Sequence, residues 1–444
     1  MPTTTTRTAV RPWPVALVLA SASFLVLFDS QSVATALPSI GAEFRLGPDV
    51  LQWVVSLYSL SVGSLLLLGG RVSDLFGHRR ALLAGLAVCA GSGLLAGCAP
   101  DMAVLLVGRG LQGAAAAFAL PAALAAAAST FTREPWRTRV FSVLAFAAWS
   151  AGLAGAVLGG LVTVHLGWRW VFLVTVPVAV AAAGLVGWLL PTYVGGRGDR
   201  RPLDAWGGLL VAAGLAALIL GLSRSAPFVA VGVVVLAAFV IVERRTADPL
   251  VPGRLLRSRQ MVGGCLAFGA YCTGYSTVIV IVSLYVQDAR HMSAVSAGLV
   301  LTPVLAGAAV SSSLTGRVLS RFTSRSVVAV ALASAAALLA VIAVLSDRGG
   351  ILGLVPWLAL WGVASGPVYV RLTRECVGDA AEADRGTASA MFESMSHVGG
   401  AISVAVLMTM LGLGAGYPAT EMVGAAVMAL GAVITMVVLP RARQ

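Results

Sequence analysis

The fold is decided by residues 70–80, which read Gly-Arg-Val-Ser-Asp-Leu-Phe-Gly-His-Arg-Arg. This short polar stretch separates two apolar runs, residues 51–69 and 81–97, and each run is about long enough to cross a bilayer core of roughly 30 Å. A connection this short makes the two runs antiparallel neighbours. Gly70 and Gly77 permit a close backbone approach or a positive φ at the turn.

The same stretch is rich in charge. Asp74 lies between Arg71 on one side and Arg79 and Arg80 on the other, which predicts an ion-pair network at a membrane surface. The alternative is an ordinary basic loop without a specific role.

The composition is that of a membrane protein. Hydrophobic residues make up 59% of the chain and charged residues 11%, and the mean hydropathy is +0.94, whereas a soluble domain is about one quarter charged. The pI near 10.5 could indicate nucleic-acid binding, but the basic residues lie in short loops between apolar runs, which favours membrane topology. The five cysteines form no CxxC pair and predict neither a disulfide framework nor a metal site.

Fourteen apolar segments predict an all-α membrane protein, because open sheet edges cannot be satisfied in lipid. The expected spans are 14–36, 50–69, 81–98, 102–128, 138–162, 168–190, 204–222, 226–242, 261–287, 295–316, 326–345, 350–370, 386–413 and 419–440.

The arginines test this count. Of the 30 basic residues, all arginine, 24 fall in alternate loops and only 5 in the loops between them, with Arg109 inside a span. The positive-inside rule therefore predicts that both termini are cytoplasmic. We expect a six-helix half over 1–190, an inserted hairpin with its loops over 191–260, and a second six-helix half over 261–444.

The glycine, acid, glycine and basic-pair pattern of residues 70–80 resembles the signature loop of the major facilitator superfamily. Further segments are similar to motifs of its fourteen-span drug:proton antiporters. They are residues 28–40, 51–60, 108–113, 167–172, 176–177, 285–287 and 298–303. One segment departs from the family, because Ala156 stands where the fifth-span antiporter motif has proline.

The resemblance implies the major facilitator fold and a secondary transporter of the cell membrane that exports apolar or cationic small molecules in exchange for protons. We expect no cofactor, no metal and no nucleic-acid partner, and we expect the chain to act as a monomer. It also implies that residues of the 70–80 loop form a gate on the inner face: Gly70, Asp74, Gly77, Arg79 and Arg80.

Asp29 and Arg109 are charged residues well inside predicted spans, where an ionised group costs at least ~2.5–3.5 kcal/mol on insertion scales. Asp29 lies seven residues before Ala36, and Arg109 seven residues after Met102, which places both roughly 10 Å below the outer surface at ~1.5 Å per residue. They could pair across the first half. The functional interpretation is proton coupling, and the alternative is a fixed ion pair that locks two helices.

Glu393 is the second acid inside a predicted span, and His397 follows four residues later on the same helix face. These two residues could form a second protonatable or cation-binding site. The alternative is an acid that reaches the inner interface and has no role in transport.

Aromatic and polar residues on the spans expected to face the cavity could build a pocket for bulky ligands. Each single aromatic residue could also be ordinary helix packing. The expected cavity residues are Trp53, Tyr58, Gln112, Phe146, Trp149, Tyr271, Tyr275, Trp361 and Phe392.

Two other function classes remain as alternatives. The substitution at Ala156 leaves uptake or exchange of a metabolite by the same fold open. A membrane-embedded enzyme is the more distant alternative, since the sequence contains no HExxH, GxSxG or Walker pattern.

Overall fold

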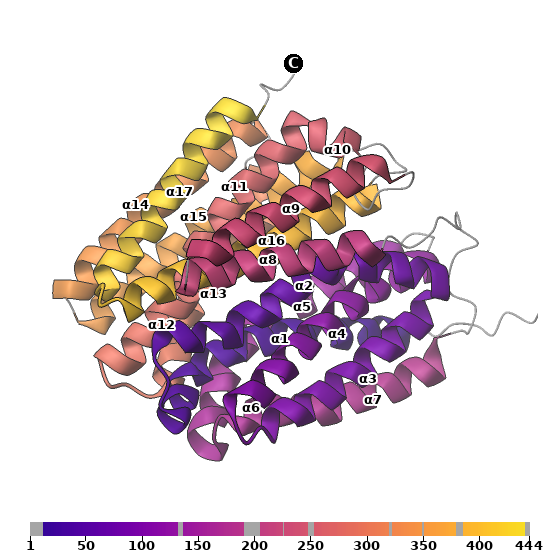
Figure 1. The fold of residues 1–444 in the computed structure, drawn as a ribbon, viewed down its shortest axis with the longest axis horizontal. Coiled ribbons are helices and arrows are strands. Elements are labelled where there is room, and N and C mark those ends of the chain that lie inside the picture. The colour runs from indigo at the N-terminus through magenta and orange to yellow at the C-terminus, as the bar shows by residue number, and fades with distance from the viewer. Residues whose placement is uncertain are drawn as a thin grey trace, which may run out of the picture.

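A computed structural model describes most of the chain, and the described part is almost entirely helical and contains no strand (Figure 1). The described residues are 12–131, 136–190, 205–224, 226–246, 253–318, 322–348, 350–378 and 385–439. Long helices lie side by side in two bundles, which confirms the all-α prediction.

The helices before residue 190 form the first bundle, which we call the N-terminal bundle. They are α1 (Pro12–Phe44), α2 (Pro48–Phe76), α3 (His78–Gly97), α4 (Met102–Thr130), α5 (Trp136–Leu166), α6 (Arg169–Leu173) and α7 (Thr175–Leu189). A helical hairpin follows, made of α8 (Ala205–Arg224) and α9 (Ala226–Arg245).

The remaining helices form the C-terminal bundle. They are α10 (Gly253–Arg257), α11 (Arg259–Ser276), the π-helical turn η1 (Thr277–Ile281), α12 (Val282–Leu284), the π-helical turn η2 (Tyr285–Ala289), α13 (Ala294–Val318), α14 (Ser324–Arg348), α15 (Ile351–Gly378), α16 (Arg385–Gly412) and α17 (Tyr417–Val438). The segment from α11 to η2 is one continuous helical rod, Arg259–Ala289.

Among the described residues, 12 helical segments are long and apolar enough to cross a membrane. The chain is therefore a multi-pass membrane protein. The helices α5 and α8 occupy the positions of the two other expected spans, but their described apolar stretches, Ser150–Leu166 and Gly207–Leu218, are shorter than those of the twelve. A count of fourteen spans thus stays a prediction.

Local sequence explains where the helices break. Gly77 alone joins α2 to α3, with φ at 94°, a conformation that side chains with a Cβ rarely adopt. The expected sixth span is divided into α6 and α7 at Val174. Pro177 lies three residues beyond and has no backbone N–H to donate to the preceding turn.

The two bundles repeat the same packing. In the N-terminal bundle α2 packs on α4, α3 packs on α4 and α7, and α1 packs on α5. The corresponding pairs in the C-terminal bundle are α13 on α15, α14 on α15 and α17, and α11 on α16. The bundles meet through two equivalent contacts, α2 with α16 and α5 with α13. This arrangement is a two-fold internal repeat.

Two close helix contacts depend on glycine. A Cβ on Gly69 of α2 would lie 2.1 Å from the carbonyl oxygen of Ala117 on α4. In the equivalent contact, a Cβ on Gly362 of α15 would lie 2.1 Å from the carbonyl oxygen of Val304 on α13. Small residues at such positions let helix backbones approach within a membrane.

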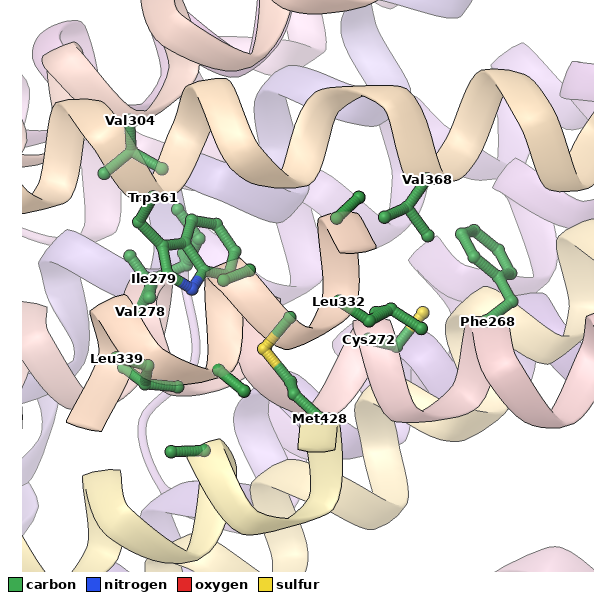
Figure 2. Close-up of a cluster of buried hydrophobic side chains, with 14 of the residues drawn as sticks. Phe268, Cys272, Val278, Ile279, Val304, Leu332, Leu339, Trp361, Val368 and Met428 are labelled. Carbon is green, nitrogen blue, oxygen red and sulfur yellow. The ribbon is translucent and has the colours of Figure 1, made fainter. Parts of the chain in front are cut away.

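Each bundle has its own hydrophobic core. In the C-terminal bundle Trp361 is wholly buried among apolar side chains that include Val304, Leu339 and Met428 (Figure 2). The expectation that Trp361 lines an open cavity is therefore wrong for this conformation, because the indole faces the inside of its own bundle.

A third core joins the bundles at one end. It contains Ile40 and Leu51 from the N-terminal bundle and Leu284 and Met408 from the C-terminal bundle. We call this end, where α1 ends and α2 begins, the α1–α2 end; the predicted topology places it outside the cell. The bundles are therefore closed against each other at the α1–α2 end.

Candidate functional site

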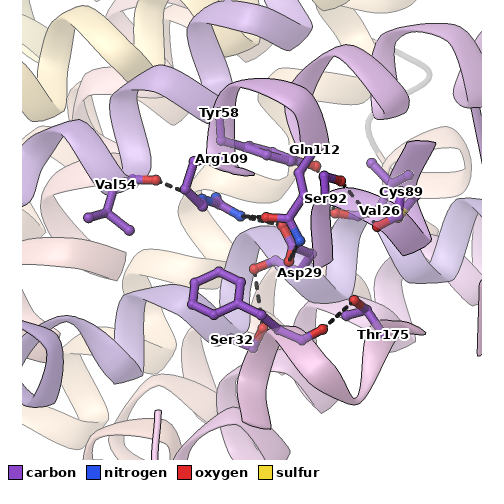
Figure 3. Close-up of polar contacts among 11 residues, drawn as sticks. Val26, Asp29, Ser32, Val54, Tyr58, Cys89, Ser92, Arg109, Gln112 and Thr175 are labelled. Atoms are coloured by element: carbon purple, nitrogen blue, oxygen red, sulfur yellow. Dashed lines mark hydrogen bonds and ion pairs between the residues drawn. The ribbon is translucent and has the colours of Figure 1, made fainter. Parts of the chain in front are cut away.

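A buried ion pair lies between α1 and α4 (Figure 3). The Arg109 guanidinium contacts the Asp29 carboxylate, with 2.5 Å between Nη1 and Oδ2. Arg109 is 1% exposed and Asp29 4% exposed. The structure thus brings together the two residues that the depth estimate predicts to pair.

Neighbouring groups complete the hydrogen bonding of this pair. Arg109 donates from Nε to the carbonyl oxygen of Val54 on α2 at 2.8 Å, and from Nη1 to Oε1 of Gln112 at 2.9 Å. Gln112 in turn donates to the second oxygen of Asp29 at 3.3 Å. The guanidinium lies 4.4 Å from the centre of the Tyr58 ring. A buried ion pair is stable only with such additional partners.

Packing of α2 on α4 positions the arginine. A Cβ on Gly113 would lie 2.4 Å from the carbonyl oxygen of Tyr58, so glycine lets α2 approach the turn that carries Arg109. Tyr58 donates to the carbonyl oxygen of Val26 on α1 at 3.0 Å. Three helices therefore meet at the guanidinium, and one of them, α2, also packs on α16 of the other bundle.

Glu393 on α16 has a tyrosine as its partner. The hydroxyl of Tyr369 on α15 donates to Glu393 Oε1 at 2.5 Å, and both side chains are half-buried. His397 shares the helix, but no hydrogen bond joins it to Glu393. Its Cβ instead lies beside Gly63 of α2, at the contact between the bundles.

Aromatic rings lie beside Glu393. Phe392 is wholly buried and stacks on Phe268 with 4.2 Å between ring centres. Phe268 also stacks on Tyr271 at 5.6 Å and lies 5.8 Å from Tyr369. We call this group, Phe268, Tyr271, Tyr369 and Phe392, the aromatic cluster.

The other expected cavity residues are scattered. Trp53 is 9% exposed and packs where α2, α8 and α16 meet. Tyr275 is half-buried and accepts a hydrogen bond from Gln31 at 3.0 Å. Phe146 is 74% exposed. The side chain of Trp149 lies outside the described residues.

The 70–80 loop is placed differently from the expected ion-pair network. Arg79 donates to the carbonyl oxygen of Gly187 at the end of α7, at 2.5 Å, and Arg80 is exposed. Ser73 and His78 share a buried hydrogen bond of 2.8 Å across the Gly77 turn. A Cβ on Gly70 would make only an ordinary van der Waals contact with Pro121, so no close helix approach requires glycine there. The side chain of Asp74 lies outside the described residues, so its pairing stays a prediction.

Sequence reasoning missed several residues. Phe268 and Tyr369 belong to the aromatic cluster, but aromatic residues in apolar spans carry no signal of the face they occupy. Glu421 was not singled out from the sequence, yet it is wholly buried four residues into α17. A signal existed, because Glu421 lies within a stretch of otherwise apolar and small residues.

Comparison with known proteins agrees with this architecture. The pattern of the Major Facilitator Superfamily matches residues 19–401. The puromycin resistance protein of Streptomyces alboniger is 34% identical over 90% of this chain and 82% of that protein. The cephamycin export protein of Amycolatopsis lactamdurans is 35% identical over 96% of this chain and 92% of that protein.

A third relative, the lincomycin resistance protein of Streptomyces lincolnensis, is 32% identical over 89% of this chain and 83% of that protein. The crystal structure of the human organic anion transporter MFSD10 has a TM-score of 0.64 at 16% identity, covering 96% of this chain and 99% of that chain. At this identity the likeness concerns the fold alone.

Proposed function

The chain belongs to the major facilitator superfamily, and we propose that it exports bulky apolar or cationic small molecules in exchange for protons, with Asp29 as the coupling acid. Relatives named for resistance to or export of antibiotics support the direction of transport. The observation that carries proton coupling is the buried Asp29–Arg109 pair, because it places a titratable carboxylate beside a helix contact that must change during transport.

In the proposed coupling step, a proton competes with Arg109 and Gln112 for the Asp29 carboxylate. When Asp29 is ionised, its carboxylate holds both Arg109 and Gln112. When a proton binds, the attraction for the guanidinium falls, and Arg109 keeps the Val54 carbonyl and the Tyr58 ring as its remaining partners. Both of these lie on α2, which packs on α16, so protonation changes the forces at the contact between the bundles.

The aromatic cluster and Glu393 form the proposed substrate site. Aromatic faces attract cations, and a carboxylate next to them favours a positively charged ligand. Glu393 already accepts a hydrogen bond from Tyr369, a partner that a bound cation could replace. We expect Glu393→Gln to weaken transport of cationic substrates and to leave that of neutral substrates near the level of the unaltered chain.

The finer features belong to the same proposal. We propose fourteen spans, two six-helix halves over 1–190 and 261–444 with the hairpin between them, cytoplasmic termini, and function as a monomer in the cell membrane. We propose that the 70–80 loop gates the inner face. Asp74→Asn then impairs transport while the amount of folded protein in the membrane stays near normal.

Uptake or exchange is the second candidate, and Ala156 favours it. The proline of the antiporter motif would remove a backbone hydrogen bond in α5. Here α5 contains no proline and packs closely on α1 through Gly155 and Gly159. Counterflow measured in inverted and right-side-out vesicles separates the two directions.

The decisive experiment is substrate-induced proton release by the purified protein. The unaltered chain should release protons when a substrate binds, and Asp29→Asn should not, because asparagine keeps the shape of aspartate without its proton. In liposomes the same variant should lose uphill, pH-driven efflux and retain downhill exchange. Unchanged proton release in Asp29→Asn would assign a fixed structural role to the ion pair and make Glu393 the next candidate.

A further inference from the structure

A further buried acid of the membrane-spanning helices lies apart from the site described above. Glu421 on α17 has no exposed surface. Its Oε1 accepts a hydrogen bond from the hydroxyl of Ser346 on α14 at 3.3 Å, and its Oε2 has no hydrogen-bond partner among the described residues. An ionised carboxylate with a single neutral donor is costly in such a place, whereas a neutral carboxylic acid is tolerated.

The charged and titratable groups around Glu421 do not neutralise it. No arginine or histidine lies within ion-pair distance of it in the described ranges. Tyr417 precedes it on α17, and Tyr285 packs against Tyr417 with 5.7 Å between ring centres. From η1, Thr277 lies beside Gly424 of α17 and does not ionise. The described ionisable residues of α16, Glu393 and His397, lie several turns before the end of that helix.

The backbone carbonyl of the same serine, Ser346, accepts a hydrogen bond from an arginine. Arg290 donates from Nε to the Tyr285 hydroxyl at 2.6 Å and from Nη2 to the carbonyl oxygen of Ser346 at 3.2 Å. The Tyr285 hydroxyl also donates to that carbonyl, at 2.7 Å. The two bonds to Ser346 fix η2 and the residue after it to the end of α14.

A cavity lies at the start of α17. It has a volume of about 180 Å³ and is lined at the α1–α2 end by Asp288 and Tyr417 and, from the N-terminal bundle, by Leu51. Glu421 lies one helical turn beyond Tyr417. The cavity lining, which includes the acid Asp288, therefore comes within about one helical turn of Glu421 along α17.

We propose that Glu421 is a second proton-binding site, that it is protonated in this conformation, and that its deprotonation loosens η2 from α14 and opens the α1–α2 end. The proton passes from Glu421 to water, and no other covalent bond changes. The carboxylate then attracts Arg290, which can approach it only by leaving Tyr285 and the Ser346 carbonyl. This inference rests on the proposed proton coupling for its role in transport, but proton binding at Glu421 can be tested without transport.

The first test is infrared spectroscopy of the purified protein at neutral pH. Labelling with ¹³C-glutamate should shift a carbonyl band of a protonated carboxylic acid, and that band should be lost in Glu421→Gln. It should persist in Asp29→Asn and in the control Glu375→Gln, which changes a half-buried acid near the other end of the C-terminal bundle. A spectrum in which Glu421→Gln removes no such band would show that Glu421 is ionised and would overturn the inference.

A second variant keeps the test decisive if Glu421→Gln does not fold. Ser346→Ala removes the hydrogen bond to Oε1 and should move the same band to higher frequency; an unmoved band would assign it to another acid and contradict the inference. The proton-release test of Asp29→Asn does not depend on this infrared band. If the proposed coupling at Asp29 fails, the Glu421 band should still be present.

Opening is measured with spin labels at Ala42 and Leu413 in a cysteine-free chain. Both positions are exposed and lie at the α1–α2 end on different bundles. The distance between the labels should increase as pH rises in the parent chain and in Glu375→Gln, and it should stay short in Glu421→Gln. An equal pH response in Glu421→Gln would exclude Glu421 as the group that controls opening.

Discussion

Gln31 on α1 donates a hydrogen bond of 3.0 Å to the hydroxyl of Tyr275 on α11, and this bond joins the two bundles two residues from Asp29. The ring of Tyr275 lies 6.1 Å from that of Tyr271, which belongs to the aromatic cluster. A continuous set of contacts therefore runs from the neighbourhood of the ion pair to the proposed substrate site.

Tyr275→Phe should weaken the contact between the bundles. The variant leaves the Gln31 amide without its acceptor, and a net hydrogen bond of about 0.5–1.5 kcal/mol corresponds to roughly a two- to tenfold shift in a conformational equilibrium. Transport rates and label distances across the bundles report the shift. The double variant Gln31→Leu/Tyr275→Phe should add little to either change alone. Additive effects would show that the two side chains act separately.

Arg109→Ala should lower the stability of the folded protein by about 3–5 kcal/mol, because it leaves the Asp29 carboxylate buried without a cation. Thermal unfolding in detergent measures this loss. Removing both charges in Asp29→Asn/Arg109→Gln should restore much of the stability but not pH-driven efflux. A double variant as unstable as Arg109→Ala would indicate that the arginine stabilises the folded protein through its packing rather than through its charge.

Gly69→Ala should destabilise the contact of α2 with α4 by about 1–3 kcal/mol, because the added methyl group would lie 2.1 Å from a backbone oxygen. The adjacent residue provides the control. A Cβ on Gly70 would meet its nearest neighbour at 3.8 Å, so Gly70→Ala should fold and melt nearly as the unaltered chain does. Equal melting temperatures for the two variants would contradict the close approach.

Cys98 should be the cysteine that reacts with a maleimide unable to cross membranes, and it should react from the outside of the cell. It is exposed at the α1–α2 end, and Cys89, Cys265, Cys272 and Cys376 are buried. Labelling intact cells and inverted vesicles, with Cys98→Ser as the blank, measures its side of the membrane. Labelling of Cys98 only in inverted vesicles would reverse the predicted topology.

The sequence predicted helix positions well because apolar spans and arginine-rich loops contrast strongly. The expected first span ends at Ala36, whereas α1 continues to Phe44. The structure nevertheless pairs Asp29 with Arg109, as the depth estimate predicted.

Burial within the bundles was harder to predict. Trp361 lies in a bundle core and Phe146 is exposed, although both are aromatic residues on apolar helices. Such helices are apolar on every side, so periodicity does not distinguish a side that faces lipid from one that faces protein. Glu421 is buried because α14 and η1 pack over the start of α17, a relationship between segments far apart in the chain.

The hairpin of α8 and α9 has a mechanical consequence for transport. Leu215 on α8 packs in one cluster with Leu60 of α2 and Ala401 of α16, so the hairpin touches both bundles. Only 11% of the apolar stretch of α9, within Pro227–Arg245, is buried inside the protein, so most of that helix faces lipid. Any change in the angle between α2 and α16 must slide α8 along at least one of them and carry α9 sideways through the bilayer. The viscosity and lateral pressure of the membrane therefore act directly on the rate at which this protein changes conformation.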